Sequence, residues 1–172
     1  MSAKAHRIVF LYSELAGYFL ACAEVLGQHP EVASVDIVHW PSHPEAPFHF
    51  SSTDNYSLHP KEKHNREGLK LLLAQINPTA IVCSGWMDAD YNHLAKTYQK
   101  RIPVVLTLDN WWTGSLKQRL AVLTAPLFIH RRFNRAWIPG EPQFLFAKKL
   151  GFSGKKLATG FYCADPGPFQ AI

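Results

Sequence analysis

Short apolar runs alternate along the chain with segments whose apolar residues recur every three or four positions. The first run, Arg7–Tyr12, is rich in Ile, Val, Phe and Leu, which is typical of a strand buried on both faces. After a short loop, the apolar residues from Phe19 to Leu26 fall at the spacing i, i+3, i+4, i+7, which lines one face of a helix. The pattern therefore predicts a strand followed by a helix that ends near Gly27.

The same alternation returns several times. A long polar loop is expected between Pro41 and Pro60, because further prolines at positions 44 and 47 interrupt regular structure. Elsewhere the spacing of apolar residues again distinguishes strands from helices. It predicts strands at 35–40, 79–83, 103–107 and 135–138, and helices at 69–76, 91–98, 116–126 and 140–151.

Strands that alternate with helices of this length predict an α/β fold: a Rossmann-like, open, mostly parallel sheet with helices on both faces. The 172 residues suit one domain of ordinary size. Ligands of such sheets bind beyond the carboxyl ends of the strands. The loops to examine are therefore 13–18, 84–90, 109–114 and 139–141.

Composition narrows the class of protein. Apolar residues make up 47% of the chain and charged residues 18%, so we expect a globular protein. A net charge of +5 favours an anionic partner, which leaves nucleotide, nucleic acid and lipid headgroup open. We do not expect nucleic-acid binding, because the basic residues do not alternate with aromatic stacking positions.

The cysteines and the apolar runs indicate the cellular compartment of the protein. Cys22, Cys83 and Cys163 are far apart in sequence and form no C-x-x-C pair, so neither a disulfide framework nor a thiolate zinc site is expected. No apolar run approaches the roughly 20 residues that span a bilayer, and the start of the chain does not resemble a signal peptide. A cytoplasmic protein is expected.

The densest cluster of polar and aromatic residues is Asp109–Gly114, directly after the strand at 103–107. A carboxylate at Asp109 could accept a hydrogen bond from a substrate hydroxyl or act as a base, with Asn110 beside it. Alternatively, Asp109 only caps the following helix while Trp111 and Trp112 pack into the domain. An exposed aromatic strip at the strand ends would favour the first interpretation.

Two other loops carry candidates. Trp86 could stack on a sugar ring, whereas Asp88 could contact a ligand or only cap the next helix. Gly17, before Tyr18, would let backbone amides approach a phosphate or sugar, or it serves a tight turn. Gly140 opens the helix that begins after the strand at 135–138.

Metal and membrane sites receive weaker support. Five histidines lie within or beside the long loop: His39, His43, His49, His59 and His64. Their spacings match no standard zinc pattern, so no metal site is expected. No cysteine lies in an activating motif, so no thiol nucleophile is expected.

The region from Lys117 to Arg135 carries basic residues among leucines. This pattern is typical of a segment that lies on an anionic membrane or of the solvated face of an ordinary helix.

Four motifs give the chain a resemblance to a known family. They are Asp109–Gln118, Phe133–Gly140, Phe146–Phe152 and Thr159–Asp165. Together they resemble the N-terminal half of group 1 retaining glycosyltransferases of the GT-B fold. The chain departs from the family at Ala16-Gly17, where many members carry two adjacent glycines.

The resemblance implies an acceptor-side Rossmann-like domain at 1–165 and, at 166–172, the start of a hinge to a C-terminal domain that holds the donor. It implies a hexosyltransferase that moves a sugar from a nucleotide-sugar to an acceptor molecule, glycan or lipid, with no separate cofactor and with this chain alone inactive. Peripheral contact at the inner membrane face would involve the Lys117 to Arg135 region. The alternative is a stand-alone module that binds a nucleotide or sugar phosphate without catalysis. The expected site comprises Asp109 as the catalytic residue and Gly17, Tyr18, Trp86, Asp88, Asn110, Trp111 and Gly140 as acceptor-binding residues.

Overall fold

A computed structural model describes residues 5–41 and 49–161. The chain divides into two compact units, and the boundary between them follows Thr79. The first unit contains the elements from β1 to α2, and the second, Ala80–Phe161, contains those from β4 to β7. The hinge expected at 166–172 lies outside the described residues.

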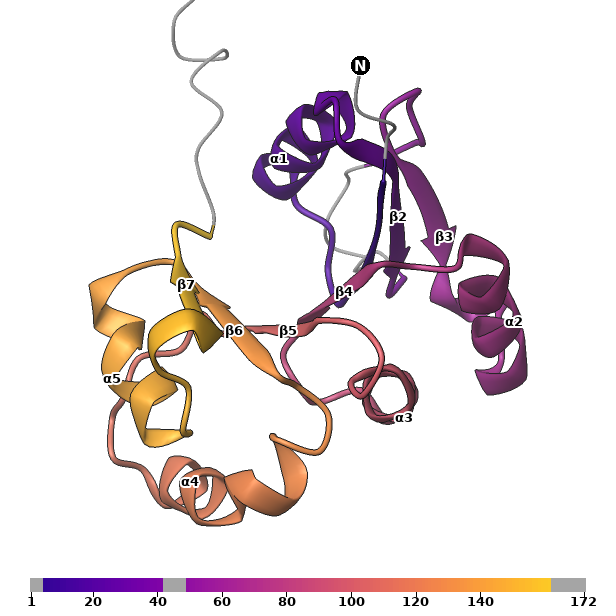
Figure 1. The fold of residues 1–172 in the computed structure, drawn as a ribbon. Helices are drawn as coiled ribbons and strands as arrows, with labels where there is room; N and C mark the ends of the chain where they lie inside the picture. Colours follow the sequence, from indigo (N-terminus) through magenta and orange to yellow (C-terminus); the bar gives the residue numbers. More distant parts are fainter. Residues whose placement is uncertain (1–4, 42–48, 162–172) are drawn as a thin grey trace, which may run out of the picture. The chain divides into compact units, whose positions relative to one another are not determined.

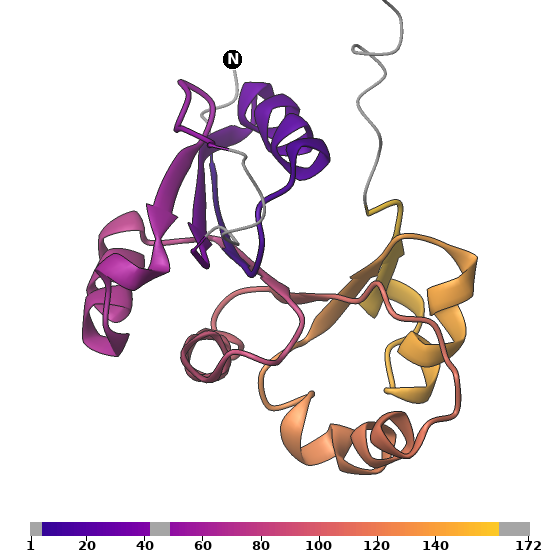
Figure 2. The ribbon, with the colours of Figure 1, turned by 180° about the vertical axis from the view of Figure 1, so that it is seen from behind.

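The strands of the first unit pair in parallel in the order β3-β2-β1. β1 and β2 are almost entirely buried toward their carboxyl ends, as their continuous apolar runs require. Figures 1 and 2 show α1 on one side of these strands and α2 on the other. The elements are β1 (His6–Tyr12), α1 (Gly17–Gln28), β2 (Val32–His39), β3 (Ser57–Pro60), the 3-10 helix η1 (Lys61–Lys63) and α2 (Arg66–Ile76).

The prediction of an uninterrupted loop from Pro41 to Pro60 was wrong at its end. Ser57–Pro60 forms β3, which pairs in parallel with β2. The segment has no β-branched residue, and Pro60 has no N–H for a sheet ladder, so its sequence does not resemble a strand. β3 is formed as the outer strand beside β2, where tertiary pairing outweighs local propensity.

The loop before β3 is fastened to α1. Glu24 accepts hydrogen bonds from the hydroxyl of Thr53 and the side-chain amide of Asn55. One helical turn further along α1, the backbone of Asn55 lies so close to Gly27 that a Cβ there would be 2.0 Å from the Asn55 carbonyl oxygen. Gly27 is therefore required by a close backbone approach, although the sequence suggested only that it stops a helix.

The strands of the second unit also pair in parallel, in the order β4-β5-β6-β7. Each helix joins neighbouring strands in the same direction along the sheet, so right-handed connections place the three helices on one face. The elements are β4 (Ala80–Ser84), α3 (Ala89–Tyr98), β5 (Val104–Thr107), α4 (Leu116–Phe128), β6 (Arg135–Ile138), α5 (Glu141–Lys149), η2 (Gly154–Lys156) and β7 (Leu157–Thr159).

The predicted α/β class is confirmed in both units: helices alternate with strands, and every described strand pairing within each unit is parallel. Three phenylalanines, Phe133, Phe146 and Phe152, are fully buried in the second unit. Helix α4 is different, because Ala125 is its one buried residue. Its periodic leucines predicted the helix but do not form core.

Candidate functional site

Polar and aromatic side chains gather at the carboxyl ends of β4, β5 and β6 in the second unit. Because these strands are parallel, their following loops meet at one edge. The amide of Gln143 in α5 donates to the backbone oxygen of Asp109 at 2.9 Å, which joins the loop after β5 to the helix after β6. The ring of Phe146, one turn further along α5, contacts both Trp86 and Trp112. The structure thus brings two of the loops selected from the sequence, 84–90 and 109–114, against helix α5, which follows the loop at 139–141.

Asp109 and Asn110 form the polar centre of this edge. Both are exposed, and the Asn110 side-chain nitrogen donates to Oδ1 of Asp109 at 2.9 Å. Within the described residues Asp109 has no cationic partner. The backbone before it is fixed by β5, and its own carbonyl is held by Gln143. The result is a carboxylate on a defined backbone, open to a hydroxyl donor.

The alternative in which Asp109 caps the next helix is wrong. The N-cap of α4 is Ser115, whose hydroxyl accepts a hydrogen bond from the backbone nitrogen of Gln118. Asp109 lies six positions earlier in the chain, outside the helix. Its charge is therefore not explained by helix capping.

The side chain of Gln118 fixes the conformation of the loop between β5 and α4. Its Oε1 accepts from the backbone nitrogens of Thr113 and Gly114 and from the Thr113 hydroxyl, at 2.7 to 3.0 Å. Its Nε2 donates to the backbone oxygen of Trp111 at 2.7 Å. Arg119 adds a hydrogen bond from Nε to the carbonyl of Gly114. The Trp111–Gly114 segment is thus secured by the first turn of α4.

The three tryptophans at this edge differ in their surroundings. Trp112 is half-buried, with its ring centroid 5.7 Å from that of Phe146 and the Lys149 ammonium 4.9 Å from its own centroid. Trp86 is also half-buried and lies 6.5 Å from Phe146. Trp111 is 62% exposed. The expected exposed aromatic at the strand ends is therefore present at Trp111, while the other two tryptophans pack on Phe146.

Of the two remaining candidates of this unit, Asp88 has a local structural role and Gly140 does not. Asp88 is the N-cap of α3, and its carboxylate accepts from the backbone nitrogens of Asp90 and Tyr91. This confirms the capping interpretation. Gly140 precedes α5 in an extended conformation, and a Cβ there would meet only the ring of Pro142, at 4.0 Å. The fold does not demand glycine at this position, so its lack of a side chain leaves room at the strand end.

Gly17 and Tyr18 belong to the other unit, where they are the first residues of α1 rather than parts of a loop. Nothing lies within 4 Å of a Cβ placed on Gly17, and the φ angle is not positive. No side chain caps this end of α1, because the N-cap is Ala16. Within this first turn the backbone nitrogen of Phe19 donates to the carbonyl of Ala16 at 3.0 Å, and the approach of a phosphate or sugar to this end of α1 stays a prediction.

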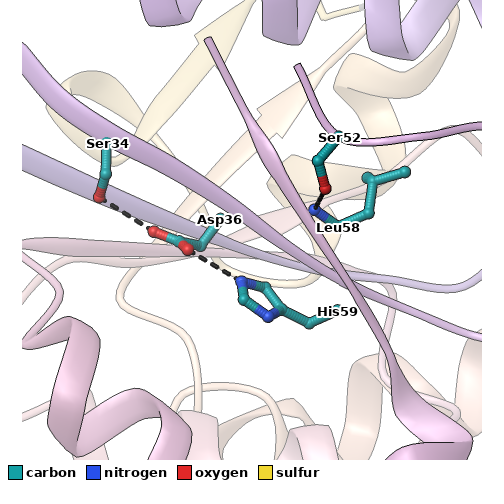
Figure 3. Close-up of polar contacts among 5 residues, drawn as sticks. All are labelled: Ser34, Asp36, Ser52, Leu58 and His59. Carbon is teal, nitrogen blue, oxygen red and sulfur yellow. Dashed lines mark hydrogen bonds and ion pairs between the residues drawn. The ribbon is translucent and has the colours of Figure 1, made fainter. Parts of the chain in front are cut away.

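A second polar cluster lies on β2 and β3 of the first unit (Figure 3). Asp36 accepts from the Ser34 hydroxyl through Oδ2 at 2.9 Å, and its Oδ1 is 2.9 Å from Nε2 of His59. The order of contacts is serine to aspartate to histidine, so the histidine does not activate the serine. The nearby Ser52 hydroxyl accepts from the Leu58 backbone nitrogen. We interpret the cluster as a set of side-chain hydrogen bonds that stabilise the pairing of β3 with β2.

Thiol and metal chemistry gain no support from the described residues. Cys83 is buried at the end of β4, and burial, with a smaller contribution from the charge of Asp88, raises the pKa of its thiol far above the usual range. It is therefore not a thiolate nucleophile. Within residues 5–41 and 49–161, no group of three His, Cys, Asp or Glu side chains is placed to hold a metal ion. His43 and Cys163 lie outside these ranges.

Sequence reasoning missed the residues that organise the site. Gln118, Gln143 and Phe146 were not among the expected site residues, and their importance comes from contacts that the structure shows with the loops at the strand ends. Gly85 and Gly114 have φ angles of 83° and 73°, which favour glycine in the loops after β4 and β5. A glycine beside a tryptophan-rich segment is the one signal that could have indicated such turns.

The described part of the chain contains no helix both long and apolar enough to cross a membrane. Comparison with known proteins adds no identification, since no protein family and no curated protein matches this chain.

Proposed function

We propose that this chain is the acceptor-binding part of a glycosyltransferase that moves a sugar from a nucleotide-sugar to an acceptor with retention of configuration. The observation that carries the proposal is the exposed ring of Trp111 beside the exposed Asp109–Asn110 pair, on a loop fixed by Gln118. An aromatic face that packs on the C–H face of a sugar, next to oxygen acceptors for its hydroxyls, is suited to a carbohydrate. The similarity of four sequence motifs to group 1 enzymes supports the same conclusion.

In this proposal the domain contributes to catalysis by holding the acceptor in position for the reaction. Trp111 orients the acceptor, and Asp109 accepts a hydrogen bond from the hydroxyl that attacks the donor sugar. The donor and most of the stabilisation of transition-state charge belong to a further domain, which is the partner that the resemblance implies. We place the protein in the cytoplasm, and neither nucleic acid nor a separate cofactor is required.

A second candidate is a module that binds a nucleotide or sugar phosphate without catalysis. One observation favours it: after Asp109 the chain contains nine Lys or Arg residues and two acidic residues, Glu141 and Asp165. One of these cations, Lys149, lies over the ring of Trp112, next to the candidate site. A cationic segment of this kind would favour a phosphorylated ligand.

Binding by the 172-residue chain separates the two candidates. Fluorescence titration with neutral oligosaccharides and with sugar phosphates should show saccharide binding that Trp111→Ala weakens about tenfold, because the stacking surface is removed. The matched control is Trp40→Ala, which removes a tryptophan of the first unit. Binding of sugar phosphates alone, unaffected by Trp111→Ala, would support the module and contradict the acceptor site.

Transfer is tested separately. The chain alone should transfer no sugar from any nucleotide-sugar, whereas the native reading frame continued past Ile172 should transfer one with retention. Turnover by residues 1–172 alone would refute the division into acceptor and donor domains.

A further inference from the structure

Helix α4 exposes its apolar side chains. Leu116, Leu120, Leu123 and Leu127 are 83%, 60%, 77% and 58% exposed, and Phe128 at the end of the helix is also exposed. These four leucines occupy positions i, i+4, i+7 and i+11, so they form one stripe along the helix. We call them the leucine stripe. An ordinary surface helix presents polar residues on its outer face, and α4 does the reverse.

The face of α4 opposite the leucine stripe packs against the rest of the unit through one small and one polar side chain. Ala125 lies about half a turn away from the leucine stripe and is buried. Gln118 is on the same side and bonds to the Trp111–Gly114 loop. The orientation of the helix is thus fixed by residues other than its leucines, and the leucine stripe is left outward in a single row.

Charge indicates what covers the stripe. No Asp or Glu occurs between Asp109 and Glu141, a segment that contains five Lys or Arg residues. Lys117 and Arg119 lie roughly a quarter turn to either side of the leucine stripe. Arg131, exposed just beyond the helix, adds a third cation. An apolar row bordered only by positive charge is complementary to an anionic lipid surface.

We propose that α4 docks this protein on an anionic bilayer. The helix, about 20 Å long, lies parallel to the surface with the leucine stripe among the acyl chains and glycerol groups. Lys117, Arg119 and Arg131 contact lipid phosphates, their stems lying along the apolar boundary. A second copy of the chain is a poorer occupant, because pairing two such faces would bring like charges together.

Docking also affects the candidate acceptor site. Gln118 and Arg119, both in the first turns of α4, hold the backbone of the Trp111–Gly114 loop. A docked α4 would therefore carry the Trp111–Gly114 loop with it, held through Gln118 on the side of the helix opposite the leucine stripe. The docking itself does not depend on sugar transfer, so the two proposals fail separately.

The test is cosedimentation of the 172-residue chain with large unilamellar vesicles. Vesicles of equal amounts of phosphatidylcholine and phosphatidylglycerol should bind the chain, and vesicles of phosphatidylcholine alone should bind it at least tenfold more weakly. Binding should fall when salt is raised from 0.1 to 1 M, because the Debye length shortens from about 10 to 3 Å. Absence of binding to both vesicles, or equal binding to both, would overturn the proposal.

Two double variants test whether the leucine stripe is the surface that contacts the bilayer. Leu120→Gln/Leu123→Gln should weaken binding at least tenfold. Val25→Gln/Leu71→Gln, at residues that are 68% and 66% exposed in the first unit, should leave it unchanged. Equal loss in both double variants would contradict a role for α4. Circular dichroism confirms that each variant remains folded.

The charges are tested in the same way. Lys117→Gln/Arg131→Gln should weaken binding to anionic vesicles about 25-fold, since each cation near such a surface contributes roughly fivefold. Lys96→Gln/Lys100→Gln removes the same charge from exposed positions outside the acid-free segment and should have little effect. Light scattering measures whether the chain forms a dimer in solution. If the wild type is a stable dimer and Leu120→Gln/Leu123→Gln is a monomer, the leucine stripe binds a second copy, and membrane docking is overturned.

Discussion

The side-chain amide of Gln118 donates to the backbone oxygen of Trp111 at 2.7 Å, across seven positions of the chain. The same side chain accepts from two backbone nitrogens of the loop. One glutamine in the first turn of α4 therefore sets the conformation of the segment that carries the exposed indole. Together with Arg119, it holds the Trp111–Gly114 part of the candidate acceptor site.

Replacing Gln118 by Leu should release the loop. Most of these hydrogen bonds are exposed, so we expect a loss of only about 1–2 kcal/mol in the free energy of unfolding. Saccharide binding should fall by more than this loss of stability explains. Chemical denaturation and fluorescence titration measure the two effects. Gln75→Leu, at an exposed position of α2, is the control. Unchanged binding in Gln118→Leu would show that the loop conformation does not matter.

Two glycine substitutions should shift stability in opposite directions. A Cβ on Gly27 would lie 2.0 Å from the Asn55 carbonyl oxygen, so Gly27→Ala should cost about 1–3 kcal/mol. Gly17 has open space around it and begins the same helix, so Gly17→Ala should stabilise by about 0.4–1 kcal/mol. Thermal unfolding compares the two variants. A stable Gly27→Ala protein would mean that the loop containing Asn55 does not pack on α1 in this way.

Glu24 should make the protein less stable in acid. Hydrogen bonds from Asn55 first and Thr53 second lower the pKa of this carboxyl below its usual value of 4.5. The contribution of Glu24 to the free energy of unfolding is therefore complete above pH 4.5. It is lost as the pH falls through the lowered pKa of this carboxyl in the folded state. Denaturation curves of wild type and Glu24→Gln should converge on acidification. Parallel pH profiles would contradict the hydrogen bonds to the carboxylate.

Sequence pattern predicted the fold where local signals agreed with tertiary structure. The strand at 135–138 and the order of strands and helices followed from apolar runs and helical spacing. β3 and β7 escaped prediction because Ser57–Pro60 and Leu157–Thr159 are short and are organised by pairing with a neighbouring strand. Both lie at the outer end of a sheet, where less apolar surface is buried.

The site was predictable only in part. Asp109 and Trp111 follow a buried strand, so their position at the strand ends could be predicted from the sequence. Periodicity showed that the leucines of α4 share a face, but the direction of that face depends on the packing of Ala125 and the bonds of Gln118. Those contacts join distant segments, and no local pattern encodes them.

The measurement that tests the central claim most directly is the effect of Asp109→Asn on sugar transfer by the chain continued in its native frame. Asparagine keeps the shape and one acceptor oxygen but removes the charge, so kcat/KM should fall by about 10–150-fold, or 1.5–3 kcal/mol. Thermal stability should stay unchanged, because Ser115 rather than Asp109 caps α4. Asp54→Asn, an exposed aspartate of the first unit, is the control. Activity of Asp109→Asn within about twofold of wild type, far below the 1.4 kcal/mol of a tenfold change, would contradict the assignment of this carboxylate to the acceptor site.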